Sequence, residues 1–420
     1  MSKANILYAQ SGGATAVINA TACGLIEAAR AQSDKIDKVY AACNGILGVI
    51  NEELIDTGNE SDESIAALRH TPASAFGTCR YKLKEPKEDK AQYQRLLEVF
   101  KAHNIRYFFY NGGGDSQDTS LKISRLSRAS DYPLTCIGIP KTIDNDLPLT
   151  DCCPGFGSVA KYIATSTREA AFDVASMAST STKVFVLEVM GRHAGWIAAA
   201  SGLARRSKKD APHLILLPEV PWVEAKILAK IKEQVTDRAY CVIVASEGLR
   251  DQDGRFLSAS GTHDAFGHAQ LGGVAPLIAD IVKNKLGFKC HWAVADYLQR
   301  SARHIASRTD VEQAYALGQR ALEFALDGYD AVMVTIVRLA DRPYQWKVGT
   351  ADLRKVANQE RTLPEAYVSE DGLNITAACE NYMRPLIKGE DYPPYRGGIP
   401  DYVRMKKILV DKRLEAFEDD

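Results

Sequence analysis

The sequence predicts an α/β protein with two domains, each a largely parallel sheet with helices on both faces. First, the chain has 420 residues, which is more than one ordinary hydrophobic core accommodates. Second, short runs rich in β-branched and aromatic residues alternate with amphipathic helical segments, and this order is typical of parallel sheets. In such sheets ligands bind beyond the carboxyl ends of the strands, so the residues after each strand are the candidates for a site.

The predicted elements follow one another along the chain in this alternating order. The strands are apolar runs at residues 5–9, 38–43, 105–110, 134–139, 183–189, 213–218, 240–245 and 329–337. Segments with helical spacing lie at 15–30, 160–178 and 311–326. The charged stretch 82–92 is expected to be a surface loop that runs into a helix. We expect the chain to cross between domains near 150–160 and again near 300.

The composition predicts a cytoplasmic globular enzyme. The chain has 46% hydrophobic and 25% charged residues, and its 52 basic and 53 acidic residues nearly cancel. This balance predicts no nucleic-acid partner and no membrane partner. Its nine cysteines form no CxxC pair and lie mostly in apolar runs, which fits a reducing compartment. The N-terminus has no signal-peptide pattern, and no stretch is long and apolar enough to span a bilayer.

Two glycine turns follow predicted strands and lead into predicted helices. Gly12 and Gly13 follow the first strand, and the stretch NGGGDS (111–116) follows the strand at 105–110. Backbone N–H groups in such turns favour anions, although each turn alone is equally compatible with tight packing. No Gly-Lys dipeptide occurs, which excludes a Walker A loop, and SGGATAVIN lacks the third glycine of a dinucleotide fingerprint.

Two further strand ends carry charged groups. IPKTIDND (139–146) places a lysine, a threonine and two aspartates after a strand. This set could supply a base, a cation for phosphoryl oxygens and a metal ligand, or it could be a plain Asx-type turn. VLEVMGRHAGW (186–196) places Arg192 at a strand end, where its positive charge could bind an anion. The same stretch is also compatible with plain packing of a strand, a turn and a helix.

Together these stretches resemble the phosphofructokinase family, and specifically its pyrophosphate-using branch. SGG, GGGDS, PKTIDND and EVMGRHAGW occur in the family's order, followed by VASEG and DYLQRS. The resemblance covers roughly residues 4–340, and the C-terminal tail resembles the extension of the pyrophosphate-using branch. It implies a pyrophosphate (donor) domain at 1–155 with 300–360. It also implies a fructose 6-phosphate domain at 156–299 with 361–420, and an active site in the cleft between the two.

The resemblance implies reversible phosphoryl transfer from pyrophosphate to the 1-hydroxyl of fructose 6-phosphate, in glycolysis or gluconeogenesis, with Mg²⁺ as cofactor. Asp144 takes the position of the general base, and Lys141, Asp115 and Arg192 are the other expected catalytic residues. Gly12, Gly13 and Arg80 are expected to bind the diphosphate. The expected acceptor-binding residues are Thr142, Ile143, Asp144, Met190, Gly191, Arg192, Glu247, Tyr297, Leu298, Gln299 and Arg300, with Lys183 supplied by the neighbouring subunit of a homodimer.

The chain departs from the family pattern at two points. His291 stands where the family commonly has an arginine for the 6-phosphate. In ATP-using relatives an aspartate for the magnesium site and then a glycine that leaves room for the nucleotide stand here. In this chain Gly114 replaces that aspartate and Asp115 replaces that glycine. Asp115 is therefore the expected metal ligand. A carboxylate about 4 Å from a phosphate charge costs roughly 4 kcal/mol at an effective dielectric near 20. We therefore predict that Asp115 excludes ATP while Lys141 stabilises charge on pyrophosphate.

Three other functions compete with this interpretation. An ATP-dependent phosphofructokinase would share the fold, but Asp115 and Lys141 oppose it. A non-catalytic regulatory subunit of the family is opposed by the retention of Asp144, Arg192 and Glu247. An unrelated nucleotide-binding module or dehydrogenase is opposed by the missing dinucleotide fingerprint.

Overall fold

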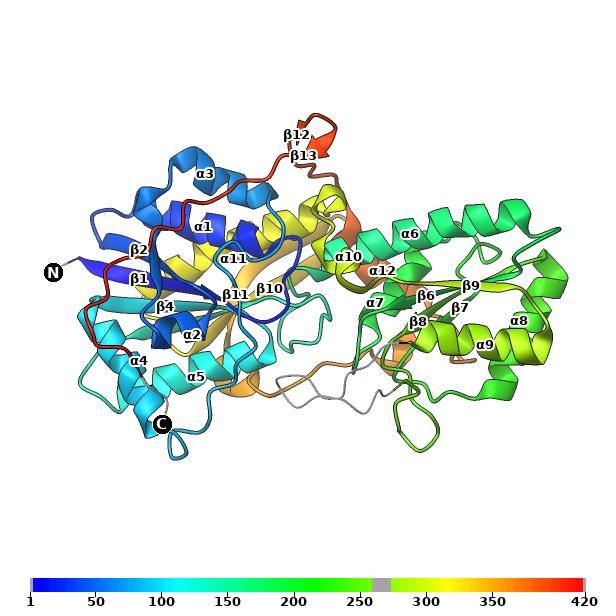
Figure 1. The fold of residues 1–420 in the computed structure, drawn as a ribbon, viewed down its shortest axis with the longest axis horizontal. Coiled ribbons are helices and arrows are strands. Elements are labelled where there is room, and N and C mark those ends of the chain that lie inside the picture. The colour runs from blue at the N-terminus through cyan, green and yellow to red at the C-terminus, as the bar shows by residue number, and fades with distance from the viewer. Residues whose placement is uncertain (1–2, 259–272, 418–420) are drawn as a thin grey trace.

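The computed structural model describes residues 3–258 and 273–417. Two sheets lie one after the other along the long axis, and each has helices on both faces (Figure 1). The predicted α/β class is confirmed by this arrangement. Every predicted strand and helix is present, with ends that differ from the prediction by a few residues.

The first sheet has seven strands in the order β11-β10-β5-β4-β1-β2-β3. Its strands are β1 (Ala4–Gln10), β2 (Ile36–Ala42), β3 (Leu54–Asp56), β4 (Ile105–Gly112), β5 (Thr135–Pro140), β10 (Val332–Asp341) and β11 (Tyr344–Asp352). The pairs β1–β2, β1–β4, β4–β5 and β5–β10 are parallel, whereas β3 and β11 join the edges antiparallel. The parallel strands therefore end at one edge, where a ligand site is expected.

Helices cover both faces of this first sheet (Figure 1). On one face lie α1 (Ile18–Ala31), α3 (Asp62–Ala67) and α11 (Arg308–Leu326), and on the other α2 (Ile46–Ile50), α4 (Lys90–Ala102) and α5 (Gly114–Arg128). The apolar side chains of α4 and α5 pack with β4 in a separate buried cluster that includes Leu96, Val99, Phe108 and Ile123.

The second sheet has four parallel strands in the order β7-β8-β6-β9. They are β6 (Val184–Val189), β7 (Leu214–Leu216), β8 (Cys241–Ser246) and β9 (Cys290–Val294). One face carries α6 (Phe156–Met177) and α7 (Trp196–Ala200), and the other carries α8 (Glu224–Arg238) and α9 (Val274–Leu286) (Figure 1). The short helices α10 (Asp296–Ser301) and α12 (Ala377–Met383) lie where the two parts of the chain meet.

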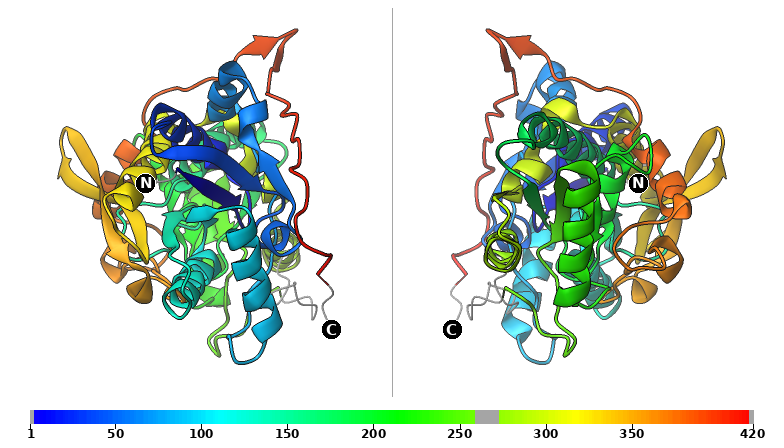
Figure 2. Two further views of the ribbon diagram at one scale, coloured as in Figure 1. Left: turned by 90° about the vertical axis from the view of Figure 1, so that its left-hand side faces the viewer. Right: turned by 90° about the vertical axis from the view of Figure 1, so that its right-hand side faces the viewer.

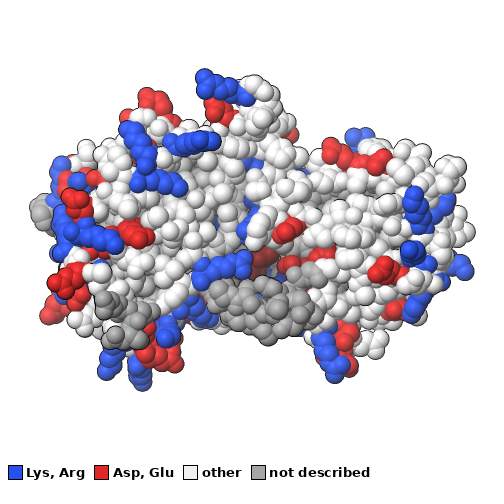
Figure 3. Space-filling view, viewed as in Figure 1, with Lys and Arg blue, Asp and Glu red and all other residues white. Residues whose placement is uncertain are grey.

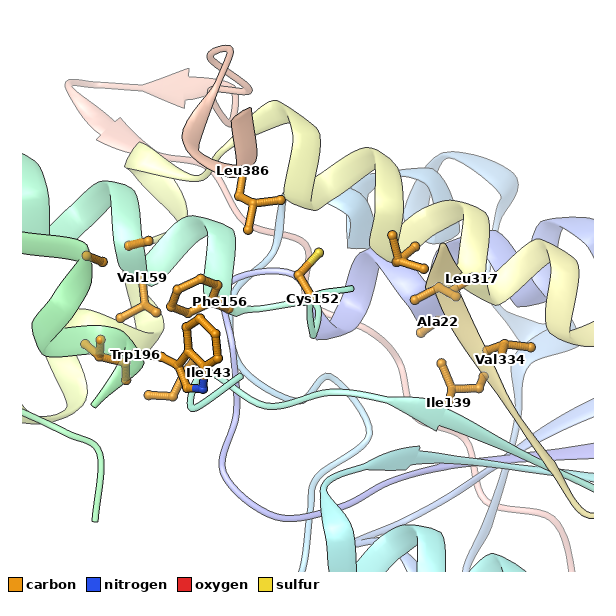
Figure 4. Close-up of a cluster of buried hydrophobic side chains, with 14 of the residues drawn as sticks. Ala22, Ile139, Ile143, Cys152, Phe156, Val159, Trp196, Leu317, Val334 and Leu386 are labelled. Carbon is orange, nitrogen blue, oxygen red and sulfur yellow. The ribbon is translucent and has the colours of Figure 1, made fainter. Parts of the chain in front are cut away.

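One continuous hydrophobic core connects the two sheets (Figure 4). It runs from Ile139 and Leu317 in the first domain to Phe156 and Trp196 at the start of α6 and α7. The rings of Phe156 and Trp196 meet edge to face, with centroids 6.2 Å apart. Because this core is shared, the carboxyl ends of the two sheets are held facing each other.

Three strands with more than two residues were absent from the predicted elements: β3, β9 and β11. No residue of β11 is fully buried, because the strand lies at the sheet edge. No residue of β9 is fully buried. Edge strands of this kind lack the continuous apolar run that marks a buried parallel strand.

The C-terminal tail corrects part of the expected domain division, which had placed all of 361–420 with the second domain. After the hairpin of β12 (Tyr395–Arg396) and β13 (Ile399–Pro400), the tail returns along the first domain (Figures 1 and 2). The Val410 N–H donates to the Leu54 carbonyl at 2.8 Å. The buried Glu52 carboxylate accepts the backbone N–H groups of Arg413 at 2.6 Å and Leu414 at 3.1 Å. The tail thus pairs with the edge of β3, whose backbone groups would otherwise lack partners.

The molecular surface carries charges of both signs without a large single-sign patch on the face shown in Figure 3. This distribution matches the formal net charge of −1. Within residues 3–258 and 273–417, every helix is too short or too polar to cross a membrane.

Candidate active site

A cavity of about 710 Å³ opens between the carboxyl ends of the two sheets. Segments after β1, β4 and β5 line it from the first domain, and segments after β6, β8 and β9 line it from the second. Thirteen of the predicted site residues line this one cavity: Gly12, Gly13, Arg80, Asp115, Lys141, Thr142, Ile143, Asp144, Met190, Arg192, Glu247, Tyr297 and Arg300.

The segment after β5 presents two carboxylates to the cavity. Asn145 adopts a left-handed conformation with φ of 53°, and its side-chain oxygen accepts the Cys153 N–H at 3.0 Å. Asp144 and Asp146, on either side of it, both line the cavity. The guanidinium of Arg361 donates to the Asn145 carbonyl at 2.8 Å. This loop is therefore held by the protein before any ligand arrives.

The electrostatic surroundings of Asp144 favour its protonated form. The pKa of Asp144 is raised to about 7, mainly by burial and also by the nearby carboxylates of Asp146 and Glu247. Lys141 and Arg192 act in the opposite direction. A carboxyl group with a pKa near neutrality can accept a proton at physiological pH and release it again. This property suits a general base.

Lys141 is almost fully buried, with 3% of its surface exposed. Its ammonium group donates to the Gly13 carbonyl at 2.6 Å, which joins the segment after β5 to the turn after β1. The pKa of Lys141 is lowered to about 7, mainly by burial and also by the positive charge of Arg300, against opposing contributions from Asp144 and Asp146. An anion bound beside this lysine would favour its charged form.

Arg300 brings the second domain against the first glycine turn. A Cβ atom at Gly13 would lie 2.9 Å from the Arg300 guanidinium, so any larger residue at this position would displace the end of the Arg300 side chain. The guanidinium lies over the ring of Tyr297, 3.9 Å from its centroid. Burial lowers the pKa of Arg300, which remains a cation. A planar cation held in this way is suited to a phosphate group.

The loop after β6 is positioned by two side-chain acceptors, the half-buried Glu247 and the buried Gln299. Gly191 has a φ of +129°, a conformation that favours glycine, and its N–H donates to Glu247 at 3.3 Å. The Met190 N–H donates to the side chain of Gln299 at 3.3 Å. Gln299 is 2% exposed and does not line the cavity. It therefore supports the Met190 loop from behind.

Three other predicted residues also lie outside the cavity. Leu298 is 65% exposed, because the helical spacing of α10 places residues 297 and 300, but not 298, toward the cavity. Gly191 contributes through the backbone bond given above. Lys183 precedes β6, at the end of the second sheet away from the cavity, and its ammonium group contacts the Ala178 carbonyl. Its expected role, from a neighbouring subunit, stays a prediction.

Several cavity residues were missed by the sequence reasoning. Lys82 lines the cavity, and its ammonium group forms an ion pair at 3.0 Å with the carboxylate of Asp115, a predicted site residue in the first turn of α5. Asn358, Gln359 and Glu360 also line the cavity. His193 also lines the cavity, and its Nδ1 lies 3.0 Å from Glu360. Only Lys82 had a local signal, since it lies two residues after Arg80.

Comparison with known proteins agrees with this geometry. Residues 5–325 match the sequence model of a family described as phosphofructokinase. The chain belongs to the phosphofructokinase family. The predicted family resemblance is thereby confirmed.

Several similar family members have names that specify the donor. Pyrophosphate–fructose 6-phosphate 1-phosphotransferase of Methylococcus capsulatus is 62% identical over 416 residues, which covers 99% of each chain. The protein of the same name from Halomonas elongata is 60% identical over the full length of both chains. The crystal structure of a pyrophosphate-dependent phosphofructokinase from Nitrosospira multiformis has a TM-score of 0.92 and 59% identity, and the match covers 99% of this chain and 100% of that one.

Proposed function

We propose that this phosphofructokinase transfers a phosphoryl group reversibly from pyrophosphate to the 1-hydroxyl of D-fructose 6-phosphate. The products are fructose 1,6-bisphosphate and phosphate. The observation that carries the proposal is the position of Asp144 in one cavity with a donor side at Gly13 and Lys141 and an acceptor side at Arg300. Relatives with at least 60% identity over nearly the whole chain have names that describe this reaction.

In this proposal the second domain holds the sugar phosphate. Arg300, stacked on Tyr297, binds the 6-phosphate through charge-assisted hydrogen bonds. Glu247 and the loop of Met190 and Arg192 contact the sugar near the reacting hydroxyl. Asp144 takes the proton of the 1-hydroxyl as that oxygen attacks phosphorus. Its pKa near 7 leaves a substantial fraction ionised at neutral pH.

The first domain holds the donor. The backbone N–H group of Gly13 faces the transferred phosphoryl group, whereas the Gly12 N–H holds the turn by donating to the Cys79 carbonyl at 3.1 Å. Arg80 lies beside donor and acceptor phosphates. Lys141 neutralises the charge that develops on the pyrophosphate oxygens. Because Lys141 is fixed by the Gly13 carbonyl, it needs no large movement to reach this position. Positioning and charge neutralisation then supply most of the acceleration.

The cavity also fits a magnesium ion bound together with the donor. Asp146 Oδ1 is buried and has no hydrogen-bond partner among the described residues, and Asp115 lies at the donor end of the same cavity. Mg²⁺ is usually held by one or two carboxylates plus substrate phosphates and water, so Asp115 and Asp146 are the residues that would hold it. When bound, the ion would neutralise phosphate charge during transfer.

A homodimer in the cytoplasm is the assembly and location we propose. The edge strand β9 leaves Trp292 49% and Val294 39% exposed, and such an apolar, unpaired edge is suited to a second copy of the chain. The neighbouring Lys183 and His291 would then lie at that interface. All nine cysteines are free, which fits a reducing compartment and a role in glycolysis or gluconeogenesis.

The proposal is tested by following the donor and the products directly. Purified protein, fructose 6-phosphate, Mg²⁺ and pyrophosphate are incubated, and ³¹P NMR records all phosphorus species. Equal formation of fructose 1,6-bisphosphate and phosphate, with loss of pyrophosphate, is expected. Starting from fructose 1,6-bisphosphate and phosphate should give pyrophosphate. Unchanged spectra in both directions would refute the proposed function.

A further inference from the structure

Lys82 connects three segments at the donor end of the cavity. Its ammonium group forms the ion pair with Asp115 at 3.0 Å and donates to the Asn358 side-chain oxygen at 3.4 Å. All three residues line the cavity. They come from the loop before α4, the first turn of α5 and the segment after β11. This pair therefore lies across the end of the cavity at which α5 begins.

The pair is supported by a buried network behind it. The Asn358 side-chain amide donates to Asp118 at 3.0 Å, and Asp118 forms an ion pair with Lys122 at 2.8 Å. Lys122 also donates to the Leu83 carbonyl, next to Lys82, at 2.8 Å. Asp118 and Lys122 are only 6% and 4% exposed. This network holds Asn358, which accepts from Lys82, and the backbone next to Lys82 in place, although the Lys82 side chain itself is half exposed.

The charge balance at this end needs a cation. An isolated Asp115 carboxylate would repel every anionic donor, pyrophosphate included, because Coulomb repulsion does not distinguish donors at equal distance. Lys82 offsets that repulsion for a donor that stops short of the pair. A donor with a further phosphate group would have to occupy the space in which Lys82 and Asp115 meet.

We propose that Lys82 is a specificity-determining residue of the donor site. It balances the charge of Asp115 for the two phosphates of pyrophosphate, and the ion pair closes the cavity to a third phosphate. This inference rests on the proposed function, since it assumes that pyrophosphate is the donor.

Lys82→Ala tests the charge-balancing part. The KM for pyrophosphate should rise about tenfold, because the Asp115 carboxylate is then left unbalanced and repels the donor, whereas the KM for fructose 6-phosphate should stay unchanged. Lys82→Arg, which keeps the charge, should retain a KM near that of the wild type. Lys84→Ala is the matched control, because Lys84 is an exposed lysine of the same loop that does not line the cavity. An unchanged KM for pyrophosphate in Lys82→Ala would overturn the inference.

Tripolyphosphate, used as an inhibitor against pyrophosphate, tests the closing part. In Asp115→Asn the ion pair is broken and Lys82 becomes available to a third phosphate. The inhibition constant Ki of tripolyphosphate should therefore fall about tenfold relative to the wild type. In the double variant Asp115→Asn/Lys82→Ala this gain should disappear. A gain that persists without Lys82 would contradict the inference. Wild-type protein that fails to use pyrophosphate would refute the proposed function itself, which is a result distinct from unchanged variants of an active enzyme.

Discussion

Replacing Asp115 by asparagine removes a charge from the donor end of the cavity while keeping the side-chain volume. A nucleotide phosphate about 4 Å from the carboxylate is repelled by roughly 4 kcal/mol at an effective dielectric of 20. The side chains of Asp115 and Lys82 are 35% and 50% exposed, so solvent screening is substantial. A dielectric near 40 reduces the repulsion to about 2 kcal/mol, which is roughly thirtyfold in affinity.

Steady-state kinetics with each donor measure this effect. The ratio of kcat/KM for ATP to kcat/KM for pyrophosphate should rise about thirtyfold in Asp115→Asn relative to the wild type. Asp131→Asn is a suitable control, since Asp131 is an exposed carboxylate beyond the far end of the same helix. A donor ratio within about threefold of the wild type would refute the electrostatic reasoning, because that reasoning assigns at least tenfold to this charge.

Four further outcomes are expected. Asp144→Ala should lower kcat by about 10²–10⁴-fold with little change in either KM, as measured by initial rates. Because the pKa of Asp144 is raised to about 7 and its ionised form is the active one, wild-type kcat/KM should fall as the pH drops below about 7, and a flat pH profile would contradict this assignment. Asp115→Gly combined with Lys141→Gly should shift the donor preference toward ATP; an unchanged donor ratio would count against the mechanism. Glu52→Gln should lower the free energy of unfolding by about 1–3 kcal/mol in denaturant titrations at pH 7.

The sign of the Glu52 effect follows from its surroundings. Burial alone would raise the pKa of Glu52, but hydrogen bonds from the Arg413 and Leu414 N–H groups and from His103 lower it overall. A lowered pKa in the folded state contributes stability above the ordinary glutamate pKa, and that stability is lost as the pH falls through the lowered value. The difference between wild type and variant should therefore shrink in acid, and a constant difference would contradict the account.

The strand-end residues could be predicted from the sequence for a physical reason. A short apolar run predicts a buried parallel strand, and in this fold the residues after such strands gather at one edge. Lys141 and Asp144 follow β5, and Arg192 follows β6, so their meeting in the cavity required only the correct strand order. The glycine turn at Gly13 was predictable in the same way.

The residues that surround Asp115 could not be predicted in this way. Asn358 and Glu360 reach the cavity only because β10 and β11 form an antiparallel hairpin, after which the chain crosses to the cleft. β11 is an edge strand without a buried apolar run, and Asn358 has no strand-end pattern of its own. Lys82, the ion-pair partner of Asp115, was missed as well, because the tertiary fold decides which loop residue lies close to a helix.

The most direct test compares pyrophosphate and ATP as donors for the unmodified protein at equal concentrations, with fructose 6-phosphate and Mg²⁺ in excess. The proposed exclusion of ATP predicts rapid formation of fructose 1,6-bisphosphate with pyrophosphate and a kcat/KM for ATP that is lower by at least about tenfold. Comparable kcat/KM values for the two donors would contradict it, because the Asp115–Lys82 pair would then not limit the length of the donor.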